Sequence, residues 1–310
     1  MAHTAADPHA GSSILGIFDR DTITLLRIPF SFFLLPIYVF ALSQAGGIEW
    51  YPTIILFFVL HLFIYPGSNA YNSYMDQDEG SIGGLKNPPK ATRHLFYASI
   101  VMDGIGLALS LLVGWRLVIL IAIYIAMSKA YSWHGIRLKK YGITAWLVVV
   151  IFQGAYTFMM VNMTAVNDFS MGWFTTPHLL CMAIATLLIG GFYPLTQVYQ
   201  HEEDSSRGDM TISYRLGIIG TFVFTATLFL AGNAIAWYYF TRYYTPDHFL
   251  IFNICLLPVT GYFLYWFIIT LKDKSKADFA HSARMTLLSS SFMIACFSVL
   301  FYLNHAGRSF

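Results

Sequence analysis

Long apolar blocks run through almost the whole chain, and they constrain its fold more than any other feature. Each is about 20 residues long, the length that an α-helix needs to cross the hydrocarbon core of a bilayer. Open sheets cannot span lipid, and the blocks lack the alternation of barrel strands. The predicted fold class is therefore all-α, a polytopic membrane protein. We place about nine transmembrane helices at residues 22–44, 51–74, 95–114, 115–133, 143–165, 172–198, 213–239, 248–271 and 284–304.

Composition supports a membrane protein and excludes a soluble domain. The chain is 57% hydrophobic and 11% charged, whereas soluble domains typically carry about 25% charged residues. Residues 1–18 are small and polar, so we expect a mobile tail, followed by a single helical membrane domain over 19–310. The first block is too long and begins too late for a cleaved signal peptide. The net charge of +2 says little about partners. We expect contact with the lipid bilayer and no nucleic-acid partner, and no protein partner can be read from the chain.

The positions of Lys and Arg predict an orientation. With the N-terminus in the cytoplasm, most cations fall in the cytoplasmic connections, and the other side carries only Arg116, Arg242 and Arg308. An excess of Lys and Arg is typical of cytoplasmic loops. We therefore expect an integral, multi-pass membrane protein with its N-terminus in the cytoplasm and its C-terminus outside.

Two acidic clusters lie where the second and sixth blocks end, on the predicted cytoplasmic side. The first runs from Asn72 to Glu79, and the second from Gln197 to Asp204. Carboxylates near membrane depth are costly and usually mark a function. The alternative is that both clusters are helix ends that reach water.

Helical spacing would bring the polar residues of each cluster onto one face, because residues three and four apart share a helix face. If the two faces meet, their oxygen atoms converge on a cavity that opens to the cytoplasm. Such oxygens suit Mg²⁺, which shares its coordination with substrate phosphates, so the pattern predicts a Mg²⁺–diphosphate site. The two stripes are Asn69, Asn72, Asp76 and Glu79, and Tyr193, Gln197, Gln200 (or His201) and Asp204.

Cations close to these clusters could neutralise a departing diphosphate, because guanidinium and ammonium groups stabilise the charge that develops on it. The alternative is that they only fix the topology. Arg27, at the cytoplasmic end of the first block, could reach the same cavity. For Asp103, inside the third block, we favour a structural role. The candidate cations are Lys86, Lys90, Arg137, Lys139, Lys140 and Arg207.

Together these features resemble the UbiA-type intramembrane prenyltransferase superfamily, whose members have nine helices with acidic motifs on the second and sixth. Asn72 and Asp76 match the first motif, and Gly80 stands in its third position, so that Asp78 or Glu79 would substitute. The second motif is atypical. Gln197 (or Thr196) and Gln200 stand at its first two steps, and only Asp204 keeps the acid.

Other segments extend the resemblance over the whole chain. The stretch from Tyr131 to Lys139 is similar to the family pattern Tyr-Ser-x-Pro-Pro-x-Arg-Leu-Lys, with Trp-His-Gly at the centre. Arg27, with Pro29 two residues on, resembles the Arg-Pro that opens the first helix in many members. The segment from Glu203 to Thr211 resembles the family segment that follows the second motif.

The resemblance implies a Mg²⁺-dependent membrane prenyltransferase that moves an isoprenyl group from an allylic isoprenyl diphosphate to a hydrophobic acceptor. The implied metal ligands are Asn72, Asp76, Asp78, Glu79, Gln200 and Asp204. The implied catalytic residues are Asp76, Asp204, Arg137, Lys139 and Arg207. The implied substrate contacts are Asn69, Arg27, Lys86, Lys90, Tyr131, Tyr193 and Gln197.

Two alternatives stay open at this point. One is a non-enzymatic transporter that uses the clusters as ion or substrate sites. The other is a degenerate family member that binds a lipid diphosphate without chemistry, which Gln197 and Gln200 suggest. The acceptor is expected to be an aromatic or quinone-precursor ring, with a porphyrin-type ring, a carotenoid or a glycerol phosphate as further possibilities.

Overall fold

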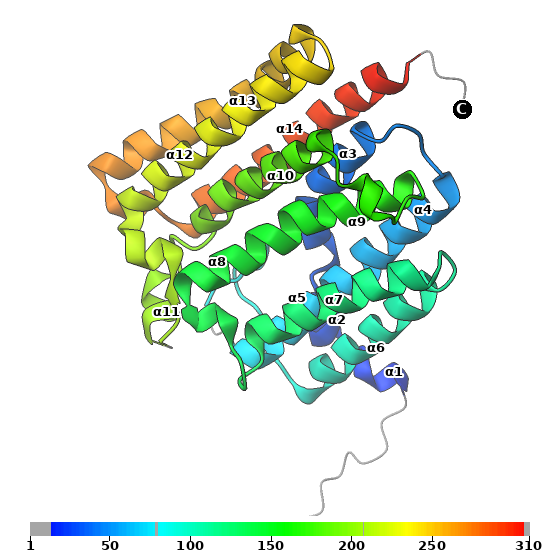
Figure 1. Cartoon of the computed structure of the whole chain (residues 1–310). Helices are drawn as coiled ribbons and strands as arrows, with labels where there is room; N and C mark the ends of the chain where they lie inside the picture. Colours follow the sequence, from blue (N-terminus) through cyan, green and yellow to red (C-terminus); the bar gives the residue numbers. More distant parts are fainter. Residues whose placement is uncertain (1–13, 78–79, 207, 307–310) are drawn as a thin grey trace, which may run out of the picture.

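A computed structural model of the chain describes residues 14–77, 80–206 and 208–306, and it shows a bundle of long helices (Figure 1). One short strand, β1 (Met210–Thr211), accompanies them. The α-helices are α1 Ile14–Ile17, α2 Arg20–Leu26, α3 Leu35–Ser43, α4 Trp50–Phe58, α5 Tyr65–Asp76, α6 Arg93–Ser110, α7 Trp115–Ser132, α8 Gly142–Val150, α9 Thr157–Ala165, α10 Thr176–Leu195, α11 His201–Ser206, α12 Ile212–Tyr243, α13 Pro246–Lys272 and α14 Phe279–His305. Short 3₁₀ or π segments are η1 Ile28–Leu34, η2 Val59–Ile64, η3 Leu138–Lys140, η4 Ile151–Tyr156, η5 Met171–Trp173 and η6 Lys274–Lys276.

The predicted all-α membrane fold is confirmed. Within the described part of the chain, eight helical stretches are long and apolar enough to cross a membrane. The predicted block at 95–114 corresponds to α6, an 18-residue helix that contains Asp103 and is not among the eight. The eight stretches are Arg20–Ser43, Trp50–Asp76, Trp115–Ser132, Gly142–Ala165, Thr176–Leu195, Ile212–Tyr243, Pro246–Lys272 and Phe279–His305.

Several spans are interrupted, and the interruptions follow from local chemistry. The stretches Trp50–Asp76 and Gly142–Ala165 each contain a π-helical segment, η2 and η4, a form that is rare and often lies near functional sites. Pro66 follows η2 and has no amide N–H to continue the regular ladder. In α12 the chain kinks at Gly217, whose φ of 68° is easily reached without a Cβ.

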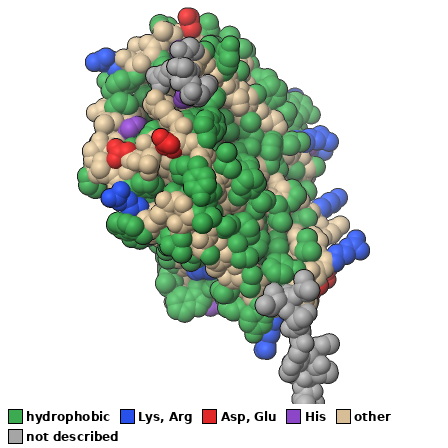
Figure 2. Space-filling view, turned by 90° about the vertical axis from the view of Figure 1, so that its right-hand side faces the viewer, with side chains coloured by type: hydrophobic (Ala, Val, Ile, Leu, Met, Phe, Trp, Pro, Cys, Tyr) green, Lys and Arg blue, Asp and Glu red, His purple; other side chains and the backbone are tan. Residues whose placement is uncertain are grey.

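The C-terminal helices of the bundle pack against its N-terminal part. α10 packs along α12, α13 pairs with α14, and α14 lies against α3 (Figure 1). In the core, the Phe40 ring lies 5.2 Å from that of Phe158 and 4.7 Å from that of Phe297, between ring centroids. The outer surface is also apolar, and Figure 2 shows one face covered largely by hydrophobic side chains. Such a surface suits contact with lipid rather than water.

A buried ion pair joins α6 to α7 close to α5. The Asp103 carboxylate lies 2.7 Å from Lys129 Nζ, and their side chains are 9% and 18% exposed. The ammonium also lies 4.0 Å from the centroid of the Tyr71 ring on α5. Gly67 leaves room for this pair, because a Cβ there would lie 3.0 Å from Asp103 Oδ1. Asp103 thus has a partner, Lys129, that the sequence did not indicate, which agrees with its expected structural role.

Breaking this pair should destabilise the protein strongly. We expect Asp103→Leu to lower the free energy of unfolding by about 3–5 kcal/mol, because it leaves the Lys129 ammonium buried without its counter-ion. The double variant D103L/K129L should recover most of the loss, since an apolar pair removes both desolvation costs. Unfolding in detergent micelles measures both variants. Equal losses in the single and double variants would contradict this account.

Candidate active site

A cavity of about 360 Å³ opens at the end of the bundle that carries Asp76, Asp204 and Asp209, here called the acidic end. Charged and amide side chains line it near that end, where α5 and α10 finish. Aromatic and aliphatic side chains from η1, α7, η4 and α10 line the rest, including Phe33, Tyr124, Met127, Phe152 and Ile189. The cavity therefore joins an ionic part to an apolar part.

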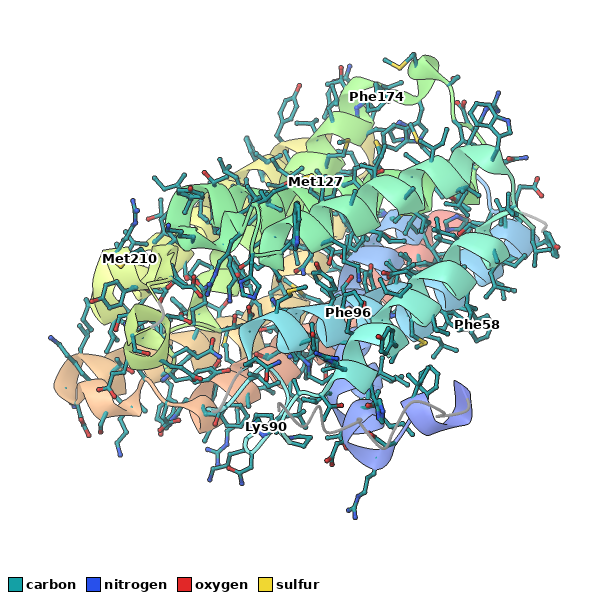
Figure 3. All side chains as sticks on the ribbon, turned by 90° about the horizontal axis from the view of Figure 1, so that it is seen from below. Phe58, Lys90, Phe96, Met127, Phe174 and Met210 are labelled. Atoms are coloured by element: carbon teal, nitrogen blue, oxygen red, sulfur yellow. The ribbon has the colours of Figure 1, made fainter. Side chains whose placement is uncertain are left out.

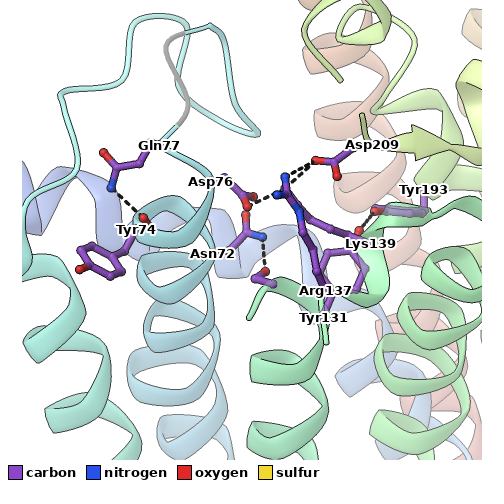
Figure 4. A network of polar contacts seen from close by, with 10 residues as sticks. Asn72, Tyr74, Asp76, Gln77, Tyr131, Arg137, Lys139, Tyr193 and Asp209 are labelled. Carbon is purple, nitrogen blue, oxygen red and sulfur yellow. Dashed lines mark hydrogen bonds and ion pairs between the residues drawn. The ribbon is translucent and has the colours of Figure 1, made fainter. Parts of the chain in front are cut away.

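The first acidic cluster reaches the cavity from α5. Asn69, Asn72 and Asp76 all line it, as their helical spacing predicts. The helix ends at Asp76, and Gln77 after it adopts a left-handed conformation with φ 51°. Asn72 Nδ2 donates a hydrogen bond to Ser132 Oγ on α7 at 2.6 Å (Figure 4), which fixes the orientation of the amide.

The second cluster reaches the same cavity, but not as one helical stripe. α10 ends at Leu195 and α11 begins at His201, so a turn separates Tyr193 from Asp204. Tyr193, Gln197, Gln200 and Asp204 nevertheless line the cavity. Gln197 is 7% exposed. Its Oε1 has no hydrogen-bond partner among the described residues, so a ligand could use it.

Two hydrogen bonds join the loop that follows the first cluster to the second cluster. The Gly80 amide donates to Glu203 Oε1 at 3.1 Å, and Gln200 Nε2 donates to the Ser81 carbonyl at 2.9 Å. A Cβ at Gly80 would lie 2.2 Å from Glu203 Oε2. The missing side chain at position 80 thus provides the space that the Glu203 carboxylate occupies.

A chain of ion pairs joins residues at the acidic end of the cavity (Figure 4). Lys139 Nζ lies 2.5 Å from Asp76 Oδ1 and 3.1 Å from Asp209 Oδ2. Arg137 Nη2 donates to the same Asp209 oxygen at 3.1 Å. Charge-assisted bonds of this kind are among the stronger polar contacts in proteins. The loop before α8 and the loop after α11 are thereby joined to α5.

Backbone strain gathers at the same place. Among the described residues, four non-glycine residues have a positive φ, and three are Arg27, Gln77 and Arg137. The left-handed conformation costs an L-residue roughly 1–2 kcal/mol. Arg27 lines the cavity, Gln77 follows Asp76, and Arg137 binds Asp209. Strained residues cluster at functional sites, which supports a functional role for this end.

Arg27 and two tyrosines complete the ionic part. Arg27 Nη1 donates to the Gly83 carbonyl at 3.1 Å, and the guanidinium lies 5.3 Å from the Phe30 ring centroid. The Tyr131 and Tyr193 hydroxyls, from α7 and α10, are hydrogen-bonded to each other at 2.6 Å. These three predicted substrate contacts therefore lie on the cavity. Burial lowers the pKa of His201, the residue that follows Gln200.

Not every predicted site residue reaches the cavity. Arg137, Lys86 and Lys90 are absent from the described residues that line it. Arg137 contacts Asp209, which does line the cavity, whereas Lys86 and Lys90 are exposed. Figure 3 shows Lys90 at the edge of the molecule, away from Met127. Asp78, Glu79 and Arg207 lie outside the described residues. The roles of these residues stay predictions.

The site also contains polar residues that we did not predict as site residues. Ser132 holds Asn72, and Asp209 holds both Lys139 and Arg137. Ser132 lies inside the Tyr131–Lys139 match, and Asp209 lies in the loop after the second cluster. The signal that could have identified them was their place in the sequence next to these motifs. Helical spacing could not, because neither residue is three or four positions from its partner.

The donor set fits a magnesium ion that is shared with substrate. Asp76, Asp204, Asn72, Gln197 and Gln200 offer carboxylate and amide oxygens, which Mg²⁺ prefers. Within the described ranges, no group of three or more Asp, Glu, His or Cys side chains could hold a metal by itself. The residues thus suit an ion that completes its shell with water and phosphate oxygens.

Comparisons with known proteins give one family and one fold. The model of the UbiA prenyltransferase family matches residues 33–302. No curated protein matches the chain.

Three solved structures are similar at low sequence identity. A UbiA homolog from Archaeoglobus fulgidus is 14% identical with a TM-score of 0.64, over 91% of this chain and 99% of that one. The same homolog bound to GPP and Mg²⁺ is 16% identical with a TM-score of 0.61, over 91% and 99%. A structure described as digeranylgeranylglyceryl phosphate synthase is 16% identical with a TM-score of 0.59, over 91% and 98%. The TM-scores show a shared fold, and at identities this low the similarity shows the fold alone.

Proposed function

Because the chain belongs to the UbiA prenyltransferase family and is a membrane prenyltransferase, we propose that its cavity ionises an allylic isoprenyl diphosphate and passes the isoprenyl group to a hydrophobic acceptor. One observation carries the proposal. Asp76, Lys139 and Asp204, from three separate segments, line a single cavity that continues into an apolar part. The cavity can hold the charged head and the hydrocarbon tail of one substrate at once.

The reaction separates charge, and the site offers groups where that charge develops. The allylic C–O bond breaks, and its electron pair stays on the departing diphosphate oxygen. Lys139 and Arg137 donate to that diphosphate, and contacts that strengthen as the bond breaks lower the barrier. The acceptor then attacks the allylic carbon and loses its proton.

Magnesium is the proposed cofactor. Asn72, Asp76, Gln200 and Asp204 would hold it, together with Asp78 or Glu79. When bound, the ion neutralises diphosphate charge and makes it a better leaving group. A relative with this fold is described as bound to GPP and Mg²⁺, which supports the assignment.

The apolar part would hold the isoprenyl tail and exclude water. The rings of Phe33, Tyr124 and Phe152 line it and can face a carbocation. Excluding water protects a reactive cation from quenching. Gln153 and Ser128 also line this part and could hydrogen-bond an uncharged acceptor, which favours an aromatic or quinone-precursor ring. We place the acidic end in the cytoplasm, in agreement with the distribution of cations.

Diphosphate release by the purified protein tests this function. We expect release from an allylic isoprenyl diphosphate with Mg²⁺ and a lipid extract as acceptor source, and no release when EDTA replaces Mg²⁺. Mass spectrometry of the products would identify the acceptor. Tight binding without turnover, across several chain lengths and acceptors, would instead indicate a degenerate member that binds lipid diphosphate.

A further inference from the structure

Asp209 occupies the centre of the ion-pair chain, and the function proposed above does not use it. The residue is 3% exposed and lines the cavity. Its Oδ2 accepts from both Lys139 and Arg137 at 3.1 Å (Figure 4). Its Oδ1 is buried and has no hydrogen-bond partner among the described residues. One carboxylate oxygen thus binds both cations, and the other binds no described residue.

The local backbone fold holds Asp209 at the centre of the ion-pair chain. Parallel β-bridges pair Tyr141 with Met210 and Gly142 with Thr211, so the segment after Asp209 is fixed to the start of α8. Gly142 permits this approach, because a Cβ there would lie 2.3 Å from the Met210 carbonyl oxygen. Asp209 is therefore held opposite the loop that carries Arg137 and Lys139.

The charges within this chain of ion pairs cancel. Two cations, Lys139 and Arg137, face two carboxylates, Asp76 and Asp209. A free diphosphate that approaches the two cations meets no net positive charge, because each cation already has a carboxylate within hydrogen-bond distance. Opposite charges this close attract each other strongly in a partly buried site. Removing the Asp209 charge should therefore raise the affinity of the two cations for diphosphate.

We propose that Asp209 is a positioning residue that aims Lys139 and Arg137 at the leaving group and also limits their affinity for free diphosphate. The inference rests on the proposed function. When substrate binds, the two cations turn part of their hydrogen bonding from Asp209 to phosphate oxygens. When the product leaves, the carboxylate takes them back, which speeds its release.

The test uses inorganic diphosphate as the probe and the full chain in detergent micelles, in EDTA so that metal plays no part. Asp209→Asn keeps the shape and removes the charge. We expect it to bind inorganic diphosphate about tenfold more tightly than the wild type, by calorimetry or competition. With Mg²⁺ and substrate, product inhibition should strengthen and kcat should fall. A residue with only a structural role would give weaker or unchanged binding, and that result would overturn the inference.

Two controls make the result specific. Asp209→Glu restores the charge and should return diphosphate affinity toward the wild-type value. Asp168→Asn removes a carboxylate from the loop before α10, at the opposite end of that helix, and should change neither affinity nor turnover. If D209N does not fold, Asp209→Ser replaces it with the same expected tightening. If neither accumulates as folded protein, Asp209 is a structural residue and the proposal is wrong.

This test can fail separately from the proposed function. A wild type without Mg²⁺-dependent turnover would remove the proposed function. A D209N protein that turns over and binds inorganic diphosphate no more tightly than the wild type would remove only the role of Asp209.

Discussion

Replacing Asp76 with Ala or Asn should lower isoprenyl transfer by about 10³-fold, the loss expected when a group that stabilises developing charge is removed. Asp76 both lines the cavity as a proposed Mg²⁺ ligand and holds Lys139. Asn has nearly the same shape but no charge, so it separates the effect of charge from that of packing. The rate of diphosphate release at saturating Mg²⁺ and substrate measures the loss.

A matched control for Asp76 lies in the loop between α13 and α14. Asp273 has a side chain that is 53% exposed, and its Oδ1 accepts from the Ser275 amide. D273N should keep the wild-type rate within about twofold, since exposed substitutions usually have small effects. A D76N protein with the wild-type rate would remove Asp76 from the mechanism.

Replacing Lys139 with Met should lower kcat/KM for the isoprenyl diphosphate by about 10²–10³-fold. The Lys139 side chain is 11% exposed and lies between two carboxylates at the cavity. Met has a similar length, so the loss reports mainly the ammonium. Steady-state kinetics with varied isoprenyl diphosphate measures it.

The neighbouring lysine provides the control. Lys140, another candidate cation, is exposed and is absent from the described residues that line the cavity. K140M therefore removes the same charge from the next position and should leave kcat/KM nearly unchanged. Because K139M leaves Asp76 and Asp209 with less compensation, its unfolding free energy must be measured as well. Equal kinetic losses in K139M and K140M would show that only long-range charge matters, and would contradict a direct role for Lys139.

The sequence predicted the features that follow from local rules. Long apolar runs leave a single fold class in lipid, so the helical membrane fold follows from chain composition and block length. The polar face of α5 could also be predicted from the sequence. Helical spacing puts Asn69, Asn72 and Asp76 on one side of this helix, and in the structure all three line the cavity.

The remaining features depend on tertiary packing, which local rules do not reveal. The break between α10 and α11 interrupts a stripe that the sequence pattern extends to Asp204. Asp209 meets Lys139 only because β1 pairs with the start of α8. Asp103 meets Lys129 because α6 packs beside α7. Each is a contact between distant segments, set by how the helices dock.

The most direct test of the central claim is a cryo-EM structure of the full chain with Mg²⁺ and an isoprenyl thiodiphosphate, whose C–S bond resists ionisation. We expect diphosphate density between Asp76 and Asp204, within hydrogen-bond distance of Lys139, and the isoprenyl tail beside Phe152. Diphosphate bound outside this cavity, or a tail that points away from the apolar part, would contradict it.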